Sequence, residues 1–120
     1  MKIRIKGNSV RFRLTKTEVD TFCETGSFSE QTTFNRSTFT YRLFAKEEIS
    51  ALEAEFEDNT ITMVLPKKEA NIWSSSSRVG YDNTMRLKNG EELYLLLEKD
   101  FVCMDETIED QSDNYPNPKL

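Results

Sequence analysis

The sequence contains no histidine. This absence excludes Ser-His-Asp and Cys-His nucleophilic chemistry, zinc sites built on histidine, and histidine general bases. Any catalysis would have to use carboxylates, lysine, arginine, tyrosine or cysteine. The only two cysteines, Cys23 and Cys103, are far apart and do not have the spacing of metal ligands. The residues therefore predict no cofactor.

Long hydrophobic runs are also missing, and none approaches the length of a membrane span. The first residues, MKIRIKG, alternate charged and aliphatic side chains and lack the apolar segment of a signal peptide. A chain with two cysteines also fits a reducing compartment, where disulfides are rare. We therefore expect a cytoplasmic protein that does not interact with a membrane.

Charge is abundant but unevenly distributed. The net charge of −5 comes from 16 basic and 21 acidic residues, which argues against general nucleic-acid binding. Residues 1–16 hold six basic residues and no acid, whereas residues 100–118 hold six acids and no base. At 120 residues, the chain has room for a single domain over 1–120, with residues 104–120 forming an acidic C-terminal strap or tail.

Alternation of apolar and polar residues predicts most of the strands. Hairpins are expected over 2–6 with 10–14, 28–34 with 38–45, and 79–88 with 91–102. Asn89-Gly90 is the strongest turn signal and indicates a type I′ turn. The segment LYLLLEKDFV is apolar on both faces, so we expect its strand to be central in its sheet.

The period changes after residue 14, where a helix is predicted over 15–24. Thr15 and Glu18 have the spacing of a capping box, and Gly26 is placed to end the helix. Val19, Phe22 and Cys23 would form its buried stripe.

Residues 47–65 allow two interpretations. The segment EEISALEAEFED has helix-forming composition, but its apolar residues alternate strictly and the alternation resumes after Asp58-Asn59. We favour a hairpin of 50–57 with 60–65, in which Leu52, Phe56, Ile61 and Met63 would be buried. Pro66 would then begin a short helix over 66–73.

Together these segments predict an α+β fold. About eight strands would form a mainly antiparallel β meander, strongly curved or barrel-like, with one or two short helices against it.

Four segments, MKIRIKGNSVRFRLTKTEVD, FEDNTITMVLP, LYLLLEKDFVC and DNYPNP, resemble a family of small bacterial proteins of unknown function. This resemblance implies one soluble domain but no reaction, ligand or catalytic residue. A much fainter similarity is to the triphosphate tunnel enzymes, which build a barrel of antiparallel strands. Their opening Glu-x-Glu-x-Lys motif corresponds here to Lys2-Ile3-Arg4-Ile5-Lys6, which lacks the metal-binding acids.

Two charged sets are candidate sites. The first hairpin would present Lys2, Arg4, Arg11 and Arg13 on one face, either as an anion-binding surface or as a solvated or ion-paired face. Glu53, Glu55 and Glu57 would share one face of a strand, either as ligands of a divalent metal or as a solvent-facing ladder.

Two further features leave alternatives open. Trp73, Arg78 and Tyr81 surround a serine-rich loop and would either line a pocket or close one end of the core. The C-terminal acids could belong to a disordered tail, a weak cation site or a strap packed on the domain. We favour the strap, with Tyr115 packed on the domain and Asp110 or Asp113 paired with an arginine of the first hairpin.

These observations favour a non-enzymatic binding or protein-interaction module. Its partner would be another protein or a second copy of the chain. The alternative is a carboxylate-based divalent-metal phosphohydrolase, or an anion (phosphate) binder that uses the basic hairpin. The phosphohydrolase requires the arginines and the glutamates to converge in one cleft.

Overall fold

The computed structural model describes residues 1–101 and 112–116. These residues form eight strands, two α-helices and one 3-10 turn. In chain order the elements are β1 (Lys2–Ile5), β2 (Ser9–Leu14), α1 (Lys16–Thr25), β3 (Ser27–Thr33), β4 (Thr38–Lys46), β5 (Glu53–Glu57), β6 (Thr60–Pro66), α2 (Lys67–Ala70), η1 (Trp73–Ser75), β7 (Gly80–Arg86) and β8 (Glu92–Lys99). Within the described residues, no helix has the length and apolar character that crossing a membrane requires.

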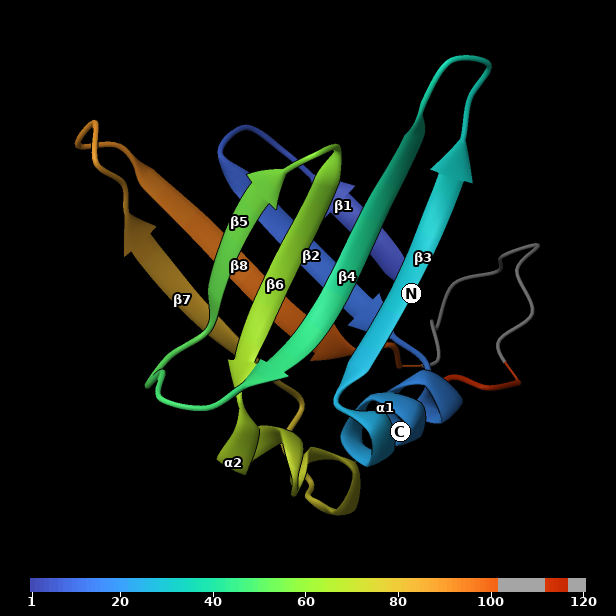
Figure 1. The fold of residues 1–120 in the computed structure, drawn as a ribbon. Helices are drawn as coiled ribbons and strands as arrows, with labels where there is room; N and C mark the ends of the chain where they lie inside the picture. The colour runs from blue at the N-terminus through green and yellow to red at the C-terminus, as the bar shows by residue number, and fades with distance from the viewer. Residues whose placement is uncertain (102–111, 117–120) are drawn as a thin grey trace.

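The strands form two four-stranded sheets (Figure 1). Sheet A has the order β1-β2-β8-β7 and sheet B the order β3-β4-β6-β5. All four local hairpins are antiparallel, but the central pairs, β2–β8 and β4–β6, are parallel. The central position predicted for the last strand is confirmed, because β8 lies between β2 and β7.

The predicted meander, strongly curved or barrel-like, is wrong in its connections. The described strands make two separate mixed sheets, and neither strand order closes on itself. Alternation identifies each hairpin because its two strands and turn are contiguous in sequence. It carries no information on which hairpins pair with one another, and here each sheet joins two hairpins through a parallel pair. The described strands also do not form the closed antiparallel barrel of the triphosphate tunnel enzymes.

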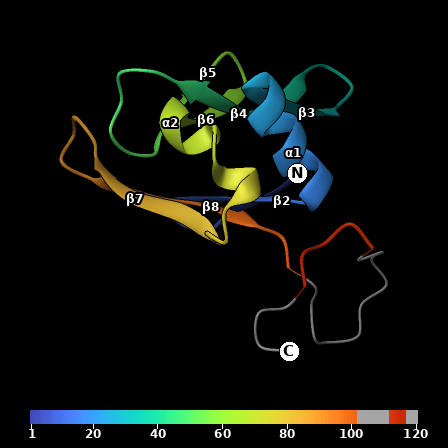
Figure 2. The ribbon, with the colours of Figure 1, turned by 90° about the horizontal axis from the view of Figure 1, so that it is seen from below.

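The two sheets face each other, and the helices close one end of the space between them (Figure 2). The fully buried core side chains come from both sheets and from the helical segments. They are Trp73, Phe12, Phe22, Leu14, Leu43, Met63, Leu65, Leu95, Leu97 and Val19. Because residues alternate along a strand, the strand residues that lie between these core positions face outward from the two sheets.

Helix α1 begins and ends as predicted. The Thr15 hydroxyl accepts a hydrogen bond from the Glu18 amide, and the Glu18 carboxylate accepts one from the Thr15 amide at 2.8 Å. Gly26 ends the helix in the left-handed conformation, with a φ of 84°. Val19 and Phe22 are fully buried, which explains why this short helix is held at the closed end.

The type I′ turn predicted for Asn89-Gly90 is found instead at Asp58-Asn59. Asp58 and Asn59 both have positive φ, as a type I′ turn requires. The Asn89-Gly90 turn is not type I′, because only Gly90 has positive φ. There the Gly90 amide donates to the Leu87 carbonyl and the Leu87 amide donates to the Glu91 carbonyl. This pattern is that of the longer hairpin loop with glycine in the left-handed position.

The hairpin chosen for residues 50–65 is confirmed as β5 and β6, and Leu52, Ile61 and Met63 are buried. The prediction for Phe56 is wrong, since this side chain is 67% exposed. The helix expected over 66–73 is shorter. Pro66 is the last residue of β6, and the helical segment divides into α2 and η1.

Candidate functional site

An apolar cleft lies between the two sheets, at the end opposite the helices. Its volume is about 450 Å³. The lining consists of Ile5, Val10, Phe39, Ala54, Glu55, Phe56, Ile61, Leu87 and Leu93. These residues belong to β1, β2, β4, β5, β6 and β8 and to the position after β7, and none of them comes from α1 or α2. The cleft is the part of the inter-sheet space that no helix covers.

The cleft residues continue the inward-facing pattern of their strands. Phe56 pairs with Ile61 across β5 and β6, and Ile5 pairs with Val10 across β1 and β2. Ile61 is buried and Val10 is partly buried, but Ile5 and Phe56 are 56% and 67% exposed. Sequence reasoning missed this site, because alternation shows which way a side chain faces but not whether another layer covers it.

The four basic residues predicted to share a face are brought together on the outer face of sheet A. Lys2 lies opposite Arg13, and Arg4 lies opposite Arg11, in the register of β1 and β2. The first pair has acidic partners. Arg13 Nε lies 2.6 Å from Glu98 Oε1, and Lys2 Nζ lies 3.3 Å from the buried carboxylate of Asp100.

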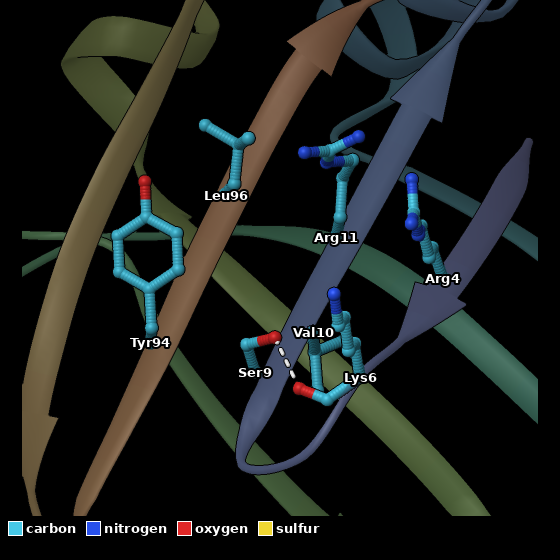
Figure 3. A pocket seen from close by; sticks show the side chains of 7 residues that line it. All are labelled: Arg4, Lys6, Ser9, Val10, Arg11, Tyr94 and Leu96. Atoms are coloured by element: carbon cyan, nitrogen blue, oxygen red, sulfur yellow. Dashed lines mark hydrogen bonds between the residues drawn. The ribbon is translucent and has the colours of Figure 1, made fainter.

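The second pair lines a hollow of about 210 Å³. Figure 3 shows Arg4 and Arg11 beside Lys6, with Tyr94 and Leu96 on the neighbouring strand β8. Within residues 1–101 and 112–116, the side chains of Arg4 and Lys6 have no ion pair or hydrogen bond. Arg11 is 3.6 Å from Glu98. Lys6 and Tyr94 were not identified from the sequence.

The glutamate ladder lies elsewhere. Glu53, Glu55 and Glu57 lie opposite Val64, Thr62 and Thr60 in the register of β5 and β6, so they face away from buried Met63. Their side chains are therefore on the outer side of sheet B, although Glu55, which lies between the inward-facing Ala54 and Phe56, also borders the cleft. The arginines are on the outer side of sheet A. Among the described residues, no group of histidine, cysteine, aspartate and glutamate is arranged to hold a metal ion.

The ladder has a structural explanation in its position, since β5 is an edge strand of sheet B. Charged side chains on an exposed edge oppose pairing with another chain. The cleft that a divalent-metal phosphohydrolase needs, with both charged sets converging, is not formed by the described residues.

Trp73, Arg78 and Tyr81 are brought together, but as a packed cluster. The Arg78 guanidinium lies 4.1 Å from the centre of the Tyr81 ring, and the Trp73 indole donates to the Arg78 carbonyl at 3.1 Å. Trp73 is fully buried and meets Tyr81 edge-to-face. Burial, followed by the nearby Glu69 carboxylate, raises the pKa of Tyr81 to about 12. The cluster closes the helical end of the core.

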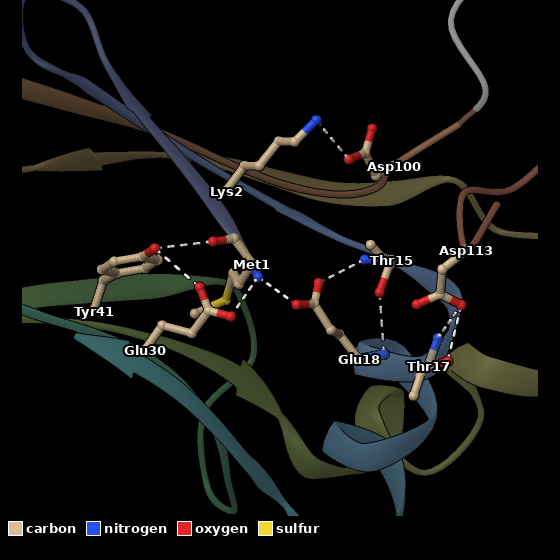
Figure 4. Close-up of polar contacts among 9 residues, drawn as sticks. All are labelled: Met1, Lys2, Thr15, Thr17, Glu18, Glu30, Tyr41, Asp100 and Asp113. Carbon is tan, nitrogen blue, oxygen red and sulfur yellow. Dashed lines mark hydrogen bonds and ion pairs between the residues drawn. The ribbon is translucent and has the colours of Figure 1, made fainter. Parts of the chain in front are cut away.

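A polar cluster lies where β1 begins (Figure 4). The amino group of Met1 pairs with Glu18 and, at 3.0 Å, with Glu30. The Tyr41 hydroxyl lies 3.0 Å from both the Met1 carbonyl and Glu30. Burial is the largest cause that raises the pKa of Tyr41 to about 12, followed by Glu30. These contacts connect the start of β1 with α1, β3 and β4.

The described part of the C-terminal segment, residues 112–116, packs on the domain. The Tyr115 ring lies 5.6 Å from that of Phe101, and the Tyr115 amide donates to the Asp100 carbonyl. Asp113 accepts hydrogen bonds from the amide and hydroxyl of Thr17 (Figure 4). The expected contact of Tyr115 is therefore present, but Asp113 binds the start of α1 rather than an arginine. Asp110 lies outside the described residues, as does most of the expected strap.

Comparison with known proteins adds a family and no activity. No significant match to the chain was found among curated proteins or among solved structures. One family model matches residues 1–119, nearly the whole sequence. The chain therefore belongs to a family of unknown function, DUF7009.

Proposed function

We propose that this domain is a non-enzymatic binding module that docks apolar side chains of a protein partner in the cleft between its sheets. The observation that carries the proposal is the exposure of Ile5 and Phe56, at 56% and 67%, on the inward-facing sides of their strands. Large apolar groups gathered at one opening are typical of interaction sites.

The composition of the cleft supports a polypeptide partner. The lining is almost entirely aliphatic and aromatic, and aromatic anchors dominate the binding energy of protein interfaces. Charged residues lie next to the exposed apolar ones in the chain, since Lys6 follows Ile5 and Glu57 follows Phe56, and Glu55 is part of the lining itself. An apolar centre within a polar rim is the usual anatomy of such interfaces.

The proposal also places the module in the cytoplasm. Among the residues that the structure describes, the half-buried Cys23 thiol on α1 has no disulfide, and cytoplasmic redox conditions keep such thiols reduced.

A selection from a random-peptide display library tests the docking site. Selected peptides should share an aromatic or large aliphatic anchor, and Phe56→Asp should weaken their binding roughly tenfold or more. Phe34→Asp is the matched control, because Phe34 is 63% exposed but does not line the cleft. Selected peptides that bind both variants equally well, or no selected peptide at all, would contradict the proposal.

Sedimentation of the unmodified chain examines whether the partner is a second copy. Self-association that Phe56→Asp abolishes and Phe34→Asp preserves would identify the partner as the chain itself. Self-association that neither variant changes would show that copies contact each other elsewhere and would count against the cleft.

A further inference from the structure

The outer face of sheet A contains two like-charged pairs that differ in their surroundings. Basic side chains lie directly opposite each other at Lys2–Arg13 and at Arg4–Arg11. Directly opposed like charges destabilise a sheet unless an opposite charge compensates them. The first pair has Glu98 and Asp100 within 2.6 Å and 3.3 Å, respectively.

The second pair lacks such compensation among the described residues. Arg4 has no acidic partner there, and Arg11 reaches Glu98 only at 3.6 Å, with Arg13 closer to the same oxygen. Lys6 adds a third positive charge to the hollow. Another acid on this face, Asp82, lies beside Tyr94, whose hydroxyl is 3.4 Å from its carboxylate. Of the three cations in the hollow, Arg4 and Lys6 therefore have no carboxylate partner among the described residues, and Arg11 shares Glu98 with Arg13.

From this arrangement we propose that Arg4, Lys6 and Arg11 bind the phosphate group of a small phosphate monoester. Guanidinium groups present paired N–H donors that match phosphate oxygens, and an ammonium adds a compact charge. The bound dianion would supply the compensation that Glu98 and Asp100 supply to the neighbouring pair.

The walls of the hollow indicate a ligand with an organic part. Tyr94, which is 40% exposed, and Leu96 lie on β8 beside the arginines (Figure 3). They provide an apolar surface next to the cations. The volume of about 210 Å³ is smaller than the roughly 300–1,000 Å³ usual for drug-sized ligands, so it suits a phosphate with a compact substituent.

This site differs from the proposed docking cleft in face and chemistry. The hollow opens on the outer side of sheet A, whereas the cleft lies between the sheets. Phenyl phosphate and inorganic phosphate are suitable probes, followed by NMR titration of the full chain. We expect both to shift the amide resonances of Arg4, Lys6 and Arg11, with phenyl phosphate binding more tightly.

Two substitutions test the charges. Arg4→Gln should weaken phenyl phosphate binding roughly tenfold or more, because a charge-assisted hydrogen bond is lost. Arg36→Gln removes the same charge from an exposed turn residue and should leave the affinity unchanged. Equal weakening by both variants would reveal general electrostatic attraction and overturn the site, as would the absence of binding to the unmodified chain.

A third substitution should strengthen phenyl phosphate binding rather than weaken it. Glu98→Gln removes the acid that competes for Arg11, so phenyl phosphate should bind severalfold more tightly. Weaker binding to this variant would overturn the proposal. Phe56→Asp should retain full phosphate binding, so failure of the docking cleft and failure of the anion site are distinguishable.

Discussion

Phe22 and Phe56 have the same side chain and follow equally clear apolar patterns, yet their environments differ. Phe22 is fully buried between α1 and Trp73, with its ring 6.5 Å from the indole ring. Phe56 faces inward from β5 but is 67% exposed at the open end. The direction of a side chain follows from its strand or helix, whereas its burial depends on the neighbouring layer.

This difference predicts unequal costs of truncation. Phe22→Ala should reduce the free energy of unfolding by about 3–5 kcal/mol, because it leaves a cavity in the core. Phe56→Ala should reduce it by less than about 1 kcal/mol, since the ring is already largely in water. Urea denaturation of both variants would measure the two costs. Similar losses would contradict the exposed position of Phe56.

Position 80 requires glycine because the backbone of the neighbouring strand lies too close for a Cβ atom, and not because of its φ angle. Gly80 lies opposite Glu98 at the start of β7, and a Cβ atom there would be 2.2 Å from the carbonyl oxygen of Leu97. Because the obstacle is backbone, the strand would have to move. Gly80→Ala should destabilise the protein by about 1–3 kcal/mol, in the range of other overpacked sites. Gly7→Ala is not a suitable control, because Gly7 has positive φ. Thermal denaturation would measure the cost of Gly80→Ala. Ser29→Ala, at an exposed strand position, is the control and should be nearly neutral in that measurement.

At the scale of elements, α1 is fixed at both of its ends. Its start carries the reciprocal capping box of Thr15 and Glu18, and the Lys16 amide donates to the Asp113 carbonyl. Its end is Gly26, whose amide donates to Phe22 and whose carbonyl accepts from Ala45 on β4. These bonds account for several groups that a helix terminus would otherwise leave unsatisfied.

Removing the cap should be measurable in chemical denaturation. Thr15→Ala should cost about 0.5–2 kcal/mol, since the Glu18 amide loses its acceptor. Thr32→Ala, on exposed β3, is the matched control and should change stability by less than about 0.5 kcal/mol. A denaturation midpoint unchanged by Thr15→Ala would show that the cap contributes little to this fold.

The elements that could be predicted are those whose signals are contiguous in sequence. The capped helix, the four hairpins and the shared face of Arg4 and Arg11 all depend on residues a few positions apart or joined by one turn. The parallel pairing of β2 with β8 could not be predicted, because it joins residues more than eighty positions apart without a local marker. The apolar cleft depends on the same long-range packing. Long-range packing also decides which basic residues of the first hairpin have acidic partners. Glu98 lies on the distant strand β8, and Asp100 follows that strand.

At the scale of the whole molecule, the two ends of the inter-sheet space differ. The closed end holds α1, α2 and the aromatic cluster around Trp73, and the described C-terminal residues add Tyr115 to it. There Lys99, which is nearly buried, lies 5.9 Å from the Trp73 ring and 5.1 Å from the Tyr115 ring. Burial lowers the pKa of Lys99, whose ammonium donates to the Ser76 carbonyl. The open end has only strand ends and turns, which leaves the cleft accessible.

Asp113 joins the C-terminal segment to the start of α1, and its titration should make that attachment visible. Hydrogen bonds from the Thr15 and Thr17 hydroxyls lower its pKa from the ordinary value of 3.8. A carboxyl with a lowered folded-state pKa stabilises the fold above its unfolded pKa, and this contribution is lost as the pH falls through the folded-state value. Asp113→Asn should therefore reduce the melting temperature near neutral pH.

The same substitution should have little effect in acid below the folded-state pKa, where Asp113 of the unmodified chain is also protonated. Thermal unfolding of both chains across the acid range would measure the difference. Glu24→Gln removes the same charge from an exposed position of α1 and is the matched control. The melting temperatures of the Asp113→Asn chain and the unmodified chain should converge in acid. If their difference stays constant down to the most acid pH, the lost interaction is not that of the ionised carboxylate. An equal loss in the control would mean that general charge, rather than the contact with Thr17, holds residues 112–116 on the domain.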